Sequence, residues 1–125
     1  MEKKIYDLHH ENLEMLKKLE FYKDEIKVMQ TRLEEVAGKN SSKDVMAQIE
    51  HFQNQLIIQR NNIDEFRHDV KQDENRLMDN IKHNPTAADH RKTEDHEAER
   101  DEVESFEKYF NDLRHELNRF LAQWM

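Results

Sequence analysis

Large apolar side chains recur at alternating steps of three and four residues along most of the chain. A first run holds Ile5, Leu8, Met15, Leu19, Tyr22, Ile26, Met29, Leu33 and Val36. A second run holds Val45, Ile49, Phe52, Leu56, Ile63, Phe66, Val70 and Leu77. A third run holds Val103, Phe106, Phe110, Leu113, Leu117, Phe120 and Trp124. This spacing places each run on one stripe of an α-helix, at the a and d positions of a heptad repeat, so the sequence predicts helices that pack on one another.

The only glycine and the only proline of the 125 residues lie between these runs. Gly38 predicts the end of the first helix, because glycine readily takes the left-handed conformation that closes a helix. Ser42 offers a hydroxyl to cap the next one. Pro85 predicts the second turn, because proline lacks the amide hydrogen that a helix interior needs. We therefore expect helices over about residues 3–37, 42–83 and 86–124.

Connections of a few residues require that helices adjacent in sequence run antiparallel. The sequence thus predicts an all-α fold: a single domain over residues 1–125, formed as an up-down-up bundle of three long helices packed as in a coiled coil. One continuous helix in a dimeric coiled coil is the alternative, and it would have to pass through both breaks.

Some stripe positions carry polar side chains in place of apolar ones: Asn12, Gln59, Asp73, His96 and Glu99. Such residues are expected to fix the register of the helices at a cost in stability. When the antiparallel helices are aligned about the predicted turns, Gln59 falls beside Tyr22. The Tyr22 hydroxyl would then hydrogen-bond the side-chain amide of Gln59. The same alignment puts Asn12 near residues 66–70.

The end of the bundle nearest Pro85 is expected to be less apolar and rich in acids and histidines. The residues of this predicted surface are His83, His90, Glu94, His96, Glu97 and Glu99. Acidic residues are favoured near a helix N-terminus, so a solvated helix start accounts for them. A docking site for a basic partner is the alternative.

Eight histidines among 28 acidic residues invite a comparison with carboxylate-bridged metal sites, whose helices carry Glu-x-x-His. The matching or similar pairs are Glu65 with His68, Asp7 with His10, and Asp112 with His115. All three pairs fall at the outer c and f positions, whereas ligands in a bundle core must point inward. We therefore predict no metal site and no cofactor, with a zinc site of His83, His96 and a nearby acid as the alternative.

The composition excludes several classes of function. A net charge of −8 disfavours binding to nucleic acid, which needs a cationic surface. The chain has no cysteine and little glycine for a phosphate-binding loop, so catalysis by an enzyme is not expected. No apolar run reaches the roughly 20 residues that span a bilayer, and the polar helix faces are acidic on balance, unlike those of membrane-surface helices. The expected location is the cytoplasm.

Four large apolar residues fall outside the stripes, at b and c positions: Phe21, Val28, Ile57 and Ile58. A cluster of this kind is typical of an interaction surface. The sequence therefore favours a non-enzymatic interaction or scaffold module that associates with itself as a dimer or with another helical protein. A metal-binding helical bundle is one alternative. A small chaperone or adaptor that covers an amphipathic helix of a client is another.

Overall fold

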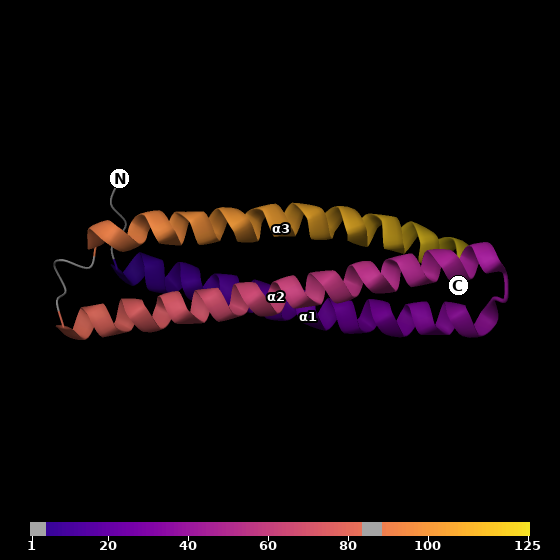
Figure 1. Ribbon diagram of the computed structural model, residues 1–125, viewed down its shortest axis with the longest axis horizontal. Helices are drawn as coiled ribbons and strands as arrows, with labels where there is room; N and C mark the ends of the chain where they lie inside the picture. Colours follow the sequence, from indigo (N-terminus) through magenta and orange to yellow (C-terminus); the bar gives the residue numbers. More distant parts are fainter. Residues whose placement is uncertain (1–4, 84–88) are drawn as a thin grey trace.

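The computed structural model describes residues 5–83 and 89–125. Within them the chain forms three α-helices and no strand: α1 (Ile5–Lys39), α2 (Lys43–His83) and α3 (Asp89–Trp124). The all-α three-helix prediction is confirmed, and the bounds differ from the expected ones by at most three residues. At 1.5 Å per residue each helix is about 50–60 Å long, and Figure 1 shows them side by side in an elongated bundle.

Ion pairs between α1 and α2 show that these helices are antiparallel. His9 of α1 contacts Glu74 of α2, whereas Lys23, further along α1, contacts Asp64, which comes earlier in α2, at 2.8 Å. Residue numbers therefore rise on one helix as they fall on the other.

The ion pairs between α1 and α3 show the opposite relation. Lys18 contacts Glu107 at 3.4 Å and Glu25 contacts Arg114 at 3.1 Å, so the numbers rise together. The first and third helices are parallel and α2 is antiparallel to both, as in an up-down-up bundle, and the colours in Figure 1 show the same directions.

The predicted apolar stripes meet in one continuous core, which extends from Met15 on α1 to Leu121 on α3. Aromatic rings fill its middle: the ring centroids of Tyr22 and Phe110 lie 4.9 Å apart, and those of Phe106 and Phe110 lie 5.7 Å apart. Gln59 is also buried there, but its amide oxygen accepts a hydrogen bond from Asn62 at 3.4 Å rather than from Tyr22.

The prediction that Gly38 ends the first helix in a left-handed conformation is wrong. The glycine has no positive φ, and α1 continues through it to Lys39. Asn40 supplies the cap instead: its side-chain amide donates to the carbonyl oxygen of Val36 at 2.9 Å and to that of Trp124 at 3.4 Å. One asparagine therefore satisfies the end of α1 and ties it to the end of α3.

Since Gly38 is helical, the Gly38→Ala variant is expected to be more stable by about 0.5–1 kcal/mol. A Cβ atom at this position meets nothing within 4 Å, so the methyl group fits without strain. Urea unfolding followed by circular dichroism measures the change. A loss of stability would show that the position needs the freedom of glycine.

Candidate functional site

Buried polar side chains from all three helices meet where α2 approaches its C-terminal end. Asn12 of α1, Asp73 of α2 and His96 of α3 are 0%, 4% and 1% exposed, and we call these three residues the polar layer. Each holds a stripe position that the spacing reserves for an apolar residue. The helical register therefore turns all three toward the bundle axis, where polar groups need hydrogen-bond partners.

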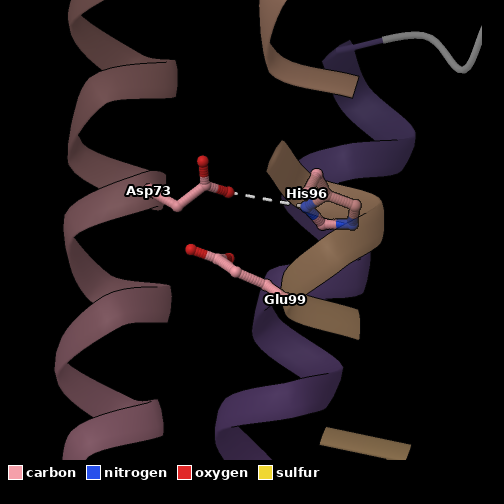
Figure 2. Close-up of side chains that lie close together, drawn as sticks. All are labelled: Asp73, His96 and Glu99. Atoms are coloured by element: carbon pink, nitrogen blue, oxygen red, sulfur yellow. Dashed lines mark hydrogen bonds and ion pairs between the residues drawn. The ribbon is translucent and has the colours of Figure 1, made fainter. Parts of the chain in front are cut away.

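Hydrogen bonds connect the members of the polar layer. The Asn12 amide donates to Asp73 Oδ2 at 3.4 Å and to Glu74 Oε2 at 2.7 Å. His96 Nδ1 lies 3.5 Å from the same Oδ2 of Asp73, the contact drawn as a dashed line in Figure 2. The Asp73 carboxylate thus links α1 to α3 from its place on α2.

The second ring nitrogen of His96 is also paired, because Nε2 hydrogen-bonds Oε2 of Glu11 on α1. Glu11 in turn lies 3.8 Å from the guanidinium of Arg100. When His96 is protonated, both ring nitrogens donate to carboxylates, and a buried cation is balanced by two anions.

These contacts set the protonation of the polar layer. Burial alone would raise the pKa of Asp73, but hydrogen bonds from His96 and Asn12 outweigh it and hold the pKa below its ordinary value. Burial alone would lower the pKa of His96, but hydrogen bonds to Asp73 and Glu11 outweigh it and raise the pKa. The hydrogen bonds therefore favour the ionised form of Asp73 and the protonated form of His96, against the effect of burial on each.

Glu99 lies one helical turn after His96 and faces the polar layer. Figure 2 shows its side chain extending from α3 toward α2, with the carboxylate next to the Asp73 side chain. Burial, and after it the negative charge of Asp73, raise the pKa of Glu99 to about 7. Its Oε2 is buried and has no hydrogen-bond partner, and the same holds for Oδ1 of Asn12.

The structure separates the residues of the predicted acidic and histidine-rich surface. His96 is an interior residue, Glu99 is half-buried, and Glu97 is exposed. The side chains of His83, His90 and Glu94 lie outside the described residues.

The three pairs of an acid and a histidine that resemble Glu-x-x-His lie on the surface, as their c and f positions predict. The exposed residues are Asp7, His10, Glu65, His68, Asp112 and His115. They contribute nothing to the polar layer.

The sequence did not predict the roles of Glu11 and Glu74. Each lies beside a stripe position, next to Asn12 and Asp73 respectively, and reaches the layer from its edge. An acid adjacent to a buried polar residue was the available signal, but in a chain with 28 acids it is too common to single out these two.

Two of the four predicted interface residues lie together. Phe21 and Val28 are 58% and 52% exposed, and both line a groove between α1 and α3. Met29 and Leu121 also line this groove, which we call the α1–α3 groove. The other two predicted residues lie on α2 and are not part of its lining.

Ile57 and Ile58 are 42% and 48% exposed on α2. The groove with Phe21 and Val28 is lined by residues of α1 and α3, so the structure places the α2 pair apart from it. The four residues thus form at least two apolar areas around the bundle.

In the described part of the chain, no helix has an apolar stretch long enough to cross a bilayer. Comparison of the chain with protein-family models, with curated proteins and with solved structures gives no match.

Proposed function

We propose that the protein is a non-enzymatic interaction module of the cytoplasm that associates with itself through the α1–α3 groove. The observation that carries this proposal is the exposure of Phe21 and Val28 on a groove lined by further apolar side chains. Large apolar residues that gather on one exposed face lose contact with water when a partner covers them, which is the main driving force of association.

The charges beside the groove favour a second copy of the chain as the partner. Asp24 and Arg32 both line it, and they lie four residues before and four residues after Val28 on α1. In a two-fold dimer with antiparallel α1 helices crossing near Val28, Asp24 of each copy meets Arg32 of the other. The face is therefore complementary to itself in charge as well as in apolar character.

Size-exclusion chromatography with light scattering at pH 7.5 tests this proposal. We expect a particle of about twice the 15.3 kDa chain mass. The variant with Phe21→Lys and Val28→Lys is expected to elute as a monomer with unchanged helicity, because two charges in the groove oppose its burial. Ile57→Lys with Ile58→Lys shows whether the interface also extends over α2.

Leu13→Lys with Met46→Lys is the matched control, since both residues are exposed and apolar and lie outside the groove. The control is expected to stay dimeric. A charge exchange adds a second test: Asp24→Arg alone should weaken the dimer, and combining it with Arg32→Asp should restore it. A wild-type monomer would contradict self-association and would favour the adaptor alternative, in which a client helix occupies the groove.

A further inference from the structure

Among the described residues, Asp73, His96 and Glu99 form a group of three side chains whose ligand-type atoms lie within 4.8 Å of one another. Two of them are almost fully buried, and they come from two helices whose packing holds them in place. Figure 2 shows both carboxylates and the imidazole converging on the same space between α2 and α3.

The orientation of His96 is that of a metal-binding histidine. Its Nε2 is paired with Glu11, whereas Nδ1 faces Asp73. Histidines that ligate a metal generally donate their other ring N–H to a carboxylate, which fixes the ring and the tautomer. In the neutral tautomer that donates Nε2–H to Glu11, Nδ1 carries a lone pair facing Asp73, so an ion bound there would replace the proton that Nδ1 shares with Asp73 in the metal-free protein.

Two buried oxygens of these and adjoining side chains have no hydrogen-bond partner. Glu99 Oε2 is one of them. Oδ1 of Asn12 is the other, and it belongs to a fully buried side chain whose amide nitrogen contacts Asp73. Buried oxygens are normally satisfied, and a cation satisfies oxygens that have no donor.

We propose that Asp73, His96 and Glu99 bind one divalent transition-metal ion, and that Glu11 positions His96 for it. One imidazole nitrogen and two carboxylates are ligands that Zn²⁺ accepts, at about 2.0–2.2 Å, with a fourth position open. Two ligands of one tetrahedral ion at such distances are about 3.3–3.6 Å apart, so the ligand atoms, now within 4.8 Å of one another, must draw together by roughly 1 Å. Rotation of the long Glu99 side chain supplies this movement.

The ion would hold the three helices together at one level of the bundle. It would bind α2 and α3 directly and α1 through the hydrogen bond between Glu11 and His96. Its positive charge would also offset the repulsion between neighbouring carboxylates, because Asp73 lies near both Glu99 and Glu74.

Calorimetric titration of chelator-treated full-length protein with Zn²⁺ at pH 7.5 tests the proposal. We expect one ion per chain and a higher unfolding temperature when zinc is present. Glu99→Gln removes a ligand without removing bulk and is expected to weaken zinc binding at least about tenfold. Glu97→Gln, at an exposed position two residues earlier, is expected to bind as the wild type does.

Circular dichroism of each variant shows whether it is folded, and Asp73→Asn serves as a second ligand variant. Co²⁺ provides a spectroscopic readout, since coordination by a histidine nitrogen changes its visible absorption. Fewer than one tightly bound ion per chain would overturn the proposal. Equal binding by the wild type and Glu99→Gln, or weak binding of several ions by surface carboxylates, would overturn it as well.

Discussion

The His96→Ala variant is expected to lose about 3–5 kcal/mol of folding free energy. The imidazole is 1% exposed and pairs with Asp73 and Glu11, so its removal leaves the buried Asp73 carboxylate without its cationic partner. Breaking one side of a buried ion pair costs far more than the pair contributes, because the remaining charge keeps its desolvation penalty. Urea unfolding at pH 7 in a chelating buffer measures the loss.

His9→Ala is the matched control for this prediction. His9 also contacts a carboxylate of α2, Glu74, but its side chain is 32% exposed. Solvent screens such a pair, and the expected loss is below about 1 kcal/mol. Equal losses for the two variants would show that burial of His96 does not determine its contribution.

A double substitution separates the loss of charge balance from the loss of volume. In His96→Leu combined with Asp73→Leu, the whole buried pair becomes apolar. Replacing both partners of a buried ion pair with apolar residues is often neutral or stabilising. We therefore expect the double variant to be more stable than His96→Ala.

The Glu99→Gln variant is expected to be more stable than the wild type at pH 8, by about 1–2 kcal/mol. The pKa of Glu99 is raised to about 7 by burial and by Asp73, so the folded protein disfavours its ionised form. One pKa unit corresponds to about 1.4 kcal/mol, and partial access to solvent reduces the effect from the full shift. Glutamine keeps the shape and removes the charge.

The sign of the pH dependence follows from linkage. The folded-state pKa of Glu99 lies above that of the unfolded chain, so stability decreases as the pH rises from about 4.5 to 7. His96 acts in the same direction, because its stabilising charge is present below pH 6.5 and is lost above its raised pKa. Asp73 acts in the opposite direction, but its contribution is lost only as the pH falls through its lowered pKa.

Unfolding curves from pH 4.5 to pH 8.5, recorded with a chelator, test this prediction. The groups that act on Glu99 are Asp73, His96, Asp69 and Arg76. We expect Glu99→Gln and the wild type to be nearly equal at pH 4.5 and to diverge above pH 6. Glu97→Gln, which is exposed, is expected to follow the wild type throughout, and the absence of any divergence would contradict the assigned role of Glu99.

The helices and their inward faces could be predicted from the sequence, because a regular apolar spacing depends only on the geometry of one helix. The polar residues Asn12, Asp73 and His96 could be placed inside for the same reason. Their meeting could not be predicted. The expected register put Asn12 near residues 66–70, whereas its partners are Asp73 and Glu74, about one helical turn further along.

The position of the turn accounts for part of that difference. The expected register assumed a first helix that ends before Gly38, but α1 continues to Lys39 and α2 begins at Lys43. The length and path of the loop between α1 and α2 determine which residues of the two helices face each other. A shift by one helical turn gives each residue a different partner. The α1–α3 groove has the same origin, since Phe21 and Val28 share a groove with Leu121 only when the register of all three helices is set.

The polar layer also divides the interior along its length. Leu8 and Leu77 are 2% exposed, yet they do not belong to the continuous core that begins at Met15. The layer thus stands between these two leucines and the apolar core. We therefore expect native-state hydrogen exchange to register a partial opening that releases the helix ends beyond the layer while the aromatic middle stays closed.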